Sequence, residues 1–109
     1  MLVIGEAIAH KEKTMVGYRI DRQLSELGEH VRGWRMVLGL TAQQVSERAG
    51  TTRDTLRKIE TGDPSVSFGK VAQVLRALGV LDQAVDALDP LSSDIGRLRA
   101  GSLTKRRAR

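Results

Sequence analysis

Cysteine is missing from this chain of 109 residues, and proline and aromatic residues are scarce, with two prolines and one residue each of Phe, Tyr and Trp. The lack of cysteine excludes a disulfide scaffold, a thiol nucleophile and a cysteine-based zinc site. A chain of this length buries a hydrophobic core without such crosslinks. We therefore expect one domain with tails.

Long apolar runs are also missing. No stretch approaches the roughly 18 apolar residues that a membrane-spanning helix requires. The apolar residues 1–9 lack the leading positive cluster of a secretory signal. We expect a cytoplasmic protein with no membrane partner.

The residue patterns of an enzyme are not found either. There is no Gly-rich phosphate loop, no pair of catalytic carboxylates in context, and no nucleophile with a nearby base. His10 and His30 are the two histidines, and neither has partners at metal-ligand spacing. We expect both to face solvent, and we expect no catalysis, metal or cofactor.

The net charge of +5 is unevenly distributed. Residues 97–109 carry six bases and no acid, whereas residues 1–96 carry 12 bases against 13 acids. The basic tail is either a nucleic-acid arm or inert, so the high pI is weak support for nucleic-acid binding. Four aspartates, Asp82, Asp86, Asp89 and Asp94, precede this tail without a base among them. They form either a solubilising face or a contact for a protein partner.

Apolar residues at helical spacing predict a first helix over residues 20–38. Its stripe consists of Ile20, Leu24, Leu27, Val31, Trp34 and Leu38. Asp21 or Ser25 would cap the start of this helix and Gly39 would end it. We expect Trp34 in the core.

Four shorter helices are predicted after Gly39. Thr41 and Gln44 form the capping box of a second helix that ends at Gly50, and Thr52 caps a third helix that runs to about Thr61. Ser67 caps a fourth, whose apolar positions are Phe68, Val71, Val74, Leu75 and Leu78. Asp89-Pro90 ends a fifth, marked by Leu81, Ala84, Val85 and Leu88.

These helices predict an all-α domain over residues 20–89. Residues 1–19 are assigned to an N-terminal arm, although their start is also compatible with a strand or a frayed helix. The polar, basic residues 90–109 are assigned to a flexible tail.

The spacing of Thr41 to Gly62 is typical of a helix-turn-helix, in which two short helices cross steeply and closely. Ser46 and Ala49 are small enough for that approach, and Gly50 suits the turn. Val45, Leu56 and Ile59 face inward. The other side of the third helix carries Arg53, Asp54, Arg57, Lys58 and Thr61.

Residues 27–80 resemble the Xre family, the helix-turn-helix domains of lambdoid phage repressors and Cro proteins. The segments GLTAQQVSERAGTTRDTLRKIETG and VLRALGV carry this resemblance. It implies a five-helix, lambda-repressor-like domain that acts as a homodimer on a palindromic operator in double-stranded DNA.

The resemblance also implies roles for individual residues. Arg53, Asp54 and Lys58 fall where such repressors contact base edges, and Arg35 and Glu60 fall where the family places a semi-buried ion pair. The expected DNA-binding residues are Thr41, Gln43, Thr52, Arg53, Asp54, Thr55, Arg57, Lys58 and Thr61. One departure is Ala42, where the family usually has a glutamine that supports phosphate contacts.

Residues 62–90, followed by a basic tail, look like HipB-type antitoxins, which repress their own operon and bind a HipA-type kinase toxin. The predicted function is therefore a transcriptional repressor, in one version the antitoxin of such a kinase. A stand-alone regulator and a protein-interaction module that has lost DNA binding are the alternatives. Leu81, Ala84, Val85 and Leu88 are either a dimer seam or part of the core.

Overall fold

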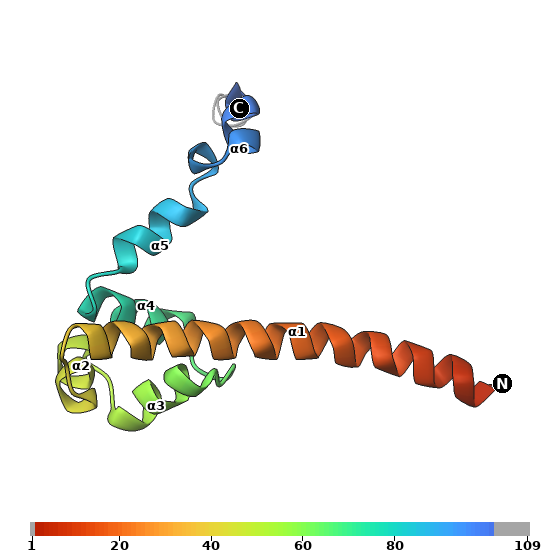
Figure 1. Ribbon diagram of the computed structural model, residues 1–109, viewed down its shortest axis with the longest axis horizontal. Helices are drawn as coiled ribbons and strands as arrows, with labels where there is room; N and C mark the ends of the chain where they lie inside the picture. The colour runs from red at the N-terminus through yellow and green to blue at the C-terminus, as the bar shows by residue number, and fades with distance from the viewer. Residues whose placement is uncertain (1, 102–109) are drawn as a thin grey trace. The chain divides into compact units, whose positions relative to one another are not determined.

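The computed structural model describes residues 2–101 and, of these, the side chains of residues 17–101. Its elements are α1 (Leu2–Val37), α2 (Ala42–Ala49), α3 (Arg53–Thr61), α4 (Phe68–Ala77), α5 (Leu81–Leu88), the 3-10 helix η1 (Pro90–Ser92) and α6 (Asp94–Leu98) (Figure 1). No strand occurs among residues 2–101, so the prediction of an all-α fold is confirmed. The chain divides into two compact units, one ending at Leu78 and one beginning at Gly79.

Helix α1 is much longer than predicted. It begins at Leu2 instead of near residue 20, and Asp21 and Ser25 lie inside it, so their predicted role as caps is wrong. Both prolines lie beyond α1, and nothing in residues 2–37 therefore removes a backbone donor and breaks the helix. The predicted end is right, because Gly39 follows the helix with φ +69° and the N–H of Leu40 donates to the carbonyl of Arg35.

The short helices α2 and α3 begin and end where the sequence predicts, and α4 begins where it predicts. Thr41, Thr52 and Ser67 are their N-caps, and each side-chain oxygen accepts a hydrogen bond from the backbone N–H three residues later. Thr41 and Gln44 complete a capping box. Gly50 and Gly62 end α2 and α3 in the left-handed conformation.

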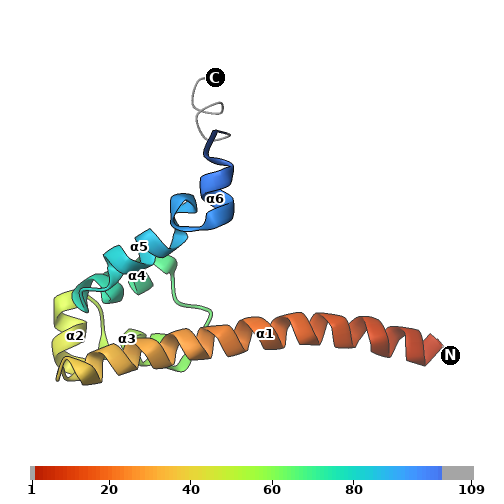
Figure 2. The ribbon, with the colours of Figure 1, turned by 45° about the horizontal axis from the view of Figure 1, so that its top comes forward.

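The core of the first unit is built from short apolar side chains. Its buried members are Val31, Val45, Ala49, Leu56, Ile59, Val74 and Leu78. Helix α3 packs mainly on α1, and α4 packs mainly on α2, so the three short helices gather along the C-terminal half of α1 (Figures 1 and 2).

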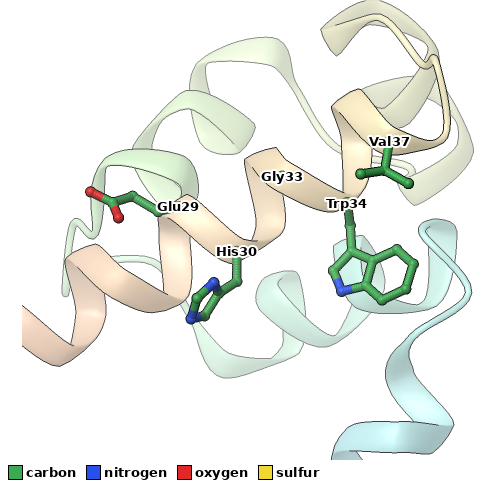
Figure 3. Close-up of a pocket in the computed structure, with 5 residues that line it drawn as sticks. All are labelled: Glu29, His30, Gly33, Trp34 and Val37. Carbon is green, nitrogen blue, oxygen red and sulfur yellow. The ribbon is translucent and has the colours of Figure 1, made fainter.

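Only part of the predicted apolar stripe on α1 is buried. Val31 is buried and Leu24 is half-buried, but Trp34 is 39% exposed, so its assignment to the core is wrong. At about 100° per residue, Trp34 lies roughly 100–120° around α1 from Gly28 and Arg35, the residues that meet α3. Trp34 lines a depression of about 310 Å³ on α1 together with Glu29, His30, Gly33 and Val37. Figure 3 shows these residues.

Two other predicted orientations can be compared with the structure. Phe68 is 79% exposed, because it lies about 100° around α4 from the buried Val74 and Leu78. His30 faces solvent, as predicted. His10 lies outside the described side chains.

A very close crossing of α1 and α3 holds the first unit together. A Cβ atom on Gly28 would lie 2.5 Å from the carbonyl oxygens of Ile59 and Glu60, and one on Gly62 would lie 2.7 Å from the backbone nitrogen of Ser25. Real Cβ atoms do not approach that closely. Glycine at both positions therefore lets the two backbones touch.

An ion pair spans the same crossing. Arg35 Nε lies 2.8 Å from Glu60 Oε2, and Arg35 Nη2 lies 3.0 Å from Glu60 Oε1, a two-pronged contact. The two side chains are only 17% and 11% exposed. The hydrogen bond to Glu60 raises the pKa of Arg35 above its ordinary value.

The second unit contains helices that the sequence analysis did not foresee. Residues 90–98, assigned there to a flexible tail, form η1 and α6 instead. Asp89, which ends α5 as predicted, also caps η1, and Ser93 caps α6. Arg97 also donates to the carbonyl of Leu91 at 3.0 Å. Residues 102–109 lie outside the described part of the chain.

We predict that Gly28→Ala destabilises the protein. The added methyl group would force α1 and α3 apart, at a cost of about 1–3 kcal/mol in urea-induced unfolding. Gly33→Ala is the matched control, because a Cβ there meets nothing within 4 Å and should add about 0.5–1 kcal/mol of helix stability. Equal stability of the two variants would contradict the close crossing.

We predict that Glu60→Gln lowers the melting temperature markedly. It leaves the half-buried charge of Arg35 uncompensated, which costs near the lower end of about 3–5 kcal/mol. The matched control is Glu26→Gln, which removes the exposed partner of Arg22 and should cost less than about 1 kcal/mol. Similar melting temperatures for both variants would show that the Arg35–Glu60 pair is not a structural contact.

Candidate nucleic-acid interface

Helices α2 and α3 are joined by residues 50–52 alone. Ser46 and Ala49 are small residues that are buried where α2 faces the core. The hydroxyl of Ser46 is satisfied within its own helix, since it donates to the carbonyl of Ala42 at 2.7 Å. The pair α2–α3 therefore has the short link and the small buried residues that a helix-turn-helix requires.

Helix α3 has one anchored side and one open side. Leu56 and Ile59 are buried, whereas Arg53, Asp54 and Arg57 are exposed. Lys58 is half-buried as a residue, with a side chain that is 42% exposed. The anchored side fixes the direction in which the charged side points.

The predicted site residues fall into two groups in the structure. Thr41 and Gln43 lie at the N-terminus of α2, and the other seven lie on or directly before α3. Gln43 donates a 2.7 Å hydrogen bond to Glu47, so its amide is held along α2. Thr61 donates to the carbonyls of Arg57 and Lys58.

Two threonines of the predicted site form a local pair. Thr52 caps α3 and its hydroxyl donates to the hydroxyl of Thr55 at 3.0 Å. Thr55 is half-buried, whereas Thr52 is exposed at the start of the helix. Of the two residues, Thr52 is the more exposed.

The charged side of α3 is internally paired. One oxygen of Asp54 lies 2.8 Å from Nη2 of Arg57, and the other lies 3.4 Å from Nζ of Lys58. The hydrogen bond from Arg57, followed by that from Lys58, lowers the pKa of Asp54 below its ordinary value. Arg53 has no ion pair within the described part of the chain.

A depression of about 500 Å³ lies beside this charged side. Its lining consists of Arg35, Ala42, Arg53, Asp54, Leu56, Arg57 and Glu60. Ala42, with its small side chain, lines this depression at the position where the Xre family usually has a glutamine. The structural pair Arg35–Glu60 thus borders the exposed surface of α3 as well as joining α1 to it.

Sequence analysis missed a second basic surface. Arg48, Gln73 and Arg76 line a depression of about 480 Å³ between α2 and α4. Both arginines lie in the last turn of their helices, where a cation complements the helix dipole. That position is readable from the sequence, but their proximity depends on the packing of α4 on α2.

Other kinds of site find no support in the part of the chain that the structure describes. Among residues 17–101, whose side chains the structure describes, there is no cluster of His, Cys, Asp or Glu that could hold a metal ion. Of the helices described, none combines the length and hydropathy that crossing a membrane demands.

The open side of α3 suits a polyanion with hydrogen-bonding edges. Guanidinium and ammonium groups attract phosphates and donate to the acceptors of guanine, while a carboxylate accepts from the amino group of cytosine. A short helix anchored on one side and exposed on the other has the dimensions to enter a DNA major groove.

Comparison with known proteins places this geometry in a family. The family model described as "Helix-turn-helix domain" matches residues 26–88, more than half of the chain. The chain is similar to a protein of Methanothermobacter thermautotrophicus named "Uncharacterized HTH-type transcriptional regulator", with 41% identity over 49 residues, 45% of this chain and 71% of the relative. No solved structure gives a significant match. The extent of the family match and the α2–α3 geometry establish that this chain belongs to the helix-turn-helix domain family.

Proposed function

We propose that this protein binds double-stranded DNA in a sequence-specific manner and represses transcription by occupying an operator. The observation that carries the proposal is the open side of α3, where Arg53, Asp54, Arg57 and Lys58 project from a helix anchored by Leu56 and Ile59. In a helix-turn-helix this is the helix that enters the major groove. The name of the relative from Methanothermobacter thermautotrophicus, a transcriptional regulator, agrees with this role.

The proposed mechanism separates positioning from base reading. Thr41 and Gln43 at the start of α2, together with Thr61 at the end of α3, contact phosphates and fix the register. The positive N-terminal ends of both helices add to this attraction for phosphate. Arg53 then donates to guanine, and the methyl group of Thr52 touches thymine.

The weak charge of residues 1–96 favours specific over general binding. With 12 bases against 13 acids, this part offers little long-range attraction to phosphates. Within residues 1–96, affinity for DNA must therefore come from the few cations that the fold directs outward. The near-neutral charge and Ala42 favour the interaction module, whereas the basic side chains that gather on α3 favour a DNA-binding role.

The antitoxin role stays a prediction that rests on the resemblance in residues 62–90. Within these residues, Asp82 and Asp86 lie exposed on α5, which makes them available to a protein partner. A stand-alone regulator needs no such contact. Co-purification with a kinase encoded next to this chain would separate the two versions.

We further propose that the protein acts as a homodimer. One α3 covers only a few base pairs, too short a sequence to stand out among genomic competitors. On α5, Val85 is 60% and Leu88 is 81% exposed, so these apolar side chains are available to a second copy. Leu81 and Ala84 of the predicted seam are half-buried.

We predict that Arg53→Ala weakens binding to a DNA duplex selected by the protein from a random library. The loss of a bidentate contact to guanine should cost about 1–3 kcal/mol and relax specificity at one base pair. Arg32→Ala, which removes an exposed arginine of α1, should leave specificity unchanged. Gel-shift titration measures both. An equal loss on selected and scrambled DNA would mean that Arg53 contacts phosphate instead.

We predict that Val85→Asp/Leu88→Asp abolishes cooperative binding without unfolding the first unit. The wild type should protect two half-sites about 34–36 Å apart, whereas the variant should bind them independently. Leu98→Asp alters an exposed leucine outside α5 and serves as the control. Protection of a single half-site by a wild-type complex of monomer mass would argue against the dimer.

A further inference from the structure

The four charges on the open side of α3 do not act independently. Asp54 is ion-paired to Arg57, three residues later, at 2.8 Å and to Lys58, four residues later, at 3.4 Å. A single carboxylate therefore bridges two of the three basic side chains that face outward. The side chains are 60%, 69% and 42% exposed for Asp54, Arg57 and Lys58, so all three remain accessible to a ligand.

Stability does not account for this arrangement. Exposed pairs at such spacing contribute little to folding, because water screens them and the side chains lose freedom. An acid in the first turn of α3 does complement the helix dipole. Asp54 is, however, the acid that pairs with both cations, and this gives it a second consequence for DNA binding.

That consequence concerns non-specific DNA. Binding without sequence preference comes from basic side chains that neutralise phosphates. A carboxylate between two cations offsets their charge, and it is itself repelled by any phosphate that approaches. Specificity commonly depends on such a repulsive element as well as on attractive contacts.

A G·C base pair offers replacements for both sides of the ion pair. In the major groove, cytosine presents the N4 amino group as a donor, and guanine presents O6 and N7 as acceptors. Asp54 can exchange the guanidinium of Arg57 for cytosine N4 while Arg57 turns to guanine. An A·T pair offers an adenine amino group but lacks the paired guanine acceptors, so the exchange is incomplete there.

We propose that Asp54 is a specificity-determining residue, which holds Arg57 and Lys58 away from phosphates and releases them at a G·C pair. The inference rests on the proposed DNA-binding function and names the base pair that α3 reads. Asp54 thereby makes sequence-independent binding weaker and makes binding at the correct site conditional on cytosine.

The test compares Asp54→Asn with wild type on a selected duplex and on a scrambled duplex. Fluorescence anisotropy over a series of salt concentrations gives the affinity and its salt dependence. Asp54→Asn should bind scrambled DNA more tightly, with a slope of log K against log salt that is steeper by about 0.9 for each cation released to a phosphate. The ratio of selected to scrambled affinity should fall by about tenfold or more.

Two further variants control for charge and for helix stability. Glu26→Gln removes an acid from an exposed ion pair on α1, and it should leave the ratio and the slope close to wild type. Asp54→Glu keeps the charge at the start of α3 and should keep the weak binding to scrambled DNA. Circular dichroism of each variant confirms that the helices are intact before titration.

A substituted duplex locates the base pair. Replacing the responsible G·C pair by A·T should weaken wild-type binding about tenfold and weaken binding of Asp54→Asn by clearly less, because that variant already lacks the contact to cytosine. Unchanged binding of Asp54→Asn to scrambled DNA, with the wild-type salt slope, would overturn the proposal even if binding to selected DNA were lost. Failure of the wild type to select any duplex would instead overturn the DNA-binding function itself.

Discussion

The backbone contact between α1 and α3 is the constraint on which the rest of the first unit depends. The carbonyl oxygens of Ile59 and Glu60 lie so close to Gly28 that a side chain on this residue would collide with them. The backbone of Ser25 lies similarly close to Gly62. These contacts fix the C-terminal end of α3 against the long helix. The N-terminal end of α3 is then oriented by its short link to α2.

The ion pair of Arg35 and Glu60 fixes the orientation of α1 and α3 at this contact. Packing through glycine is close but offers no side chain to oppose sliding or rotation. The two-pronged contact between guanidinium and carboxylate has one favourable geometry, because both groups are planar. It stands at the edge of the depression beside Arg53 and Asp54. The same pair therefore joins the scaffold of the fold to the surface proposed to meet DNA.

Short-range signals in the sequence were sufficient for α2, α3 and α4. A hydroxyl side chain before each helix, and glycine after α2 and α3, are local choices that the backbone itself requires. The helix-turn-helix followed from the same signals, with Ser46 and Ala49 as the small residues at the crossing. Helical periodicity likewise separates the buried side of α3, with Leu56 and Ile59, from its charged side, whereas the candidate DNA-binding residues were assigned by the resemblance to the Xre family and stay a prediction.

Features that depend on packing could not be predicted in this way. A stripe of apolar residues on α1 predicts a buried face, but how much of it is covered depends on how many helices pack there, and Trp34 was misplaced for that reason. The start of α1 was misplaced because Asp21 and Ser25 are compatible with a cap as well as with a helix interior. Residues 90–98 were assigned to a flexible tail for their polar composition, although Asp89 and Ser93 cap the short helices that form there.

Charge pairing was the other feature that the sequence left open. The spacing of Asp54, Arg57 and Lys58 permits i to i+3 and i to i+4 contacts, but exposed side chains at that spacing also adopt other rotamers. The structure shows one carboxylate with both cations. Asp54, Arg57 and Lys58, which the sequence presents as separate candidates for base contacts, are therefore electrostatically coupled.

The central claim is that the open side of α3 is the surface that meets DNA. The most direct test is a titration of the isotopically labelled protein with its selected duplex, followed by two-dimensional NMR of the backbone amides. The account predicts that the largest changes fall at residues 41–44 and 52–58, at the starts of α2 and α3. Changes confined to α4 or to the second unit, with α3 unaffected, would contradict it.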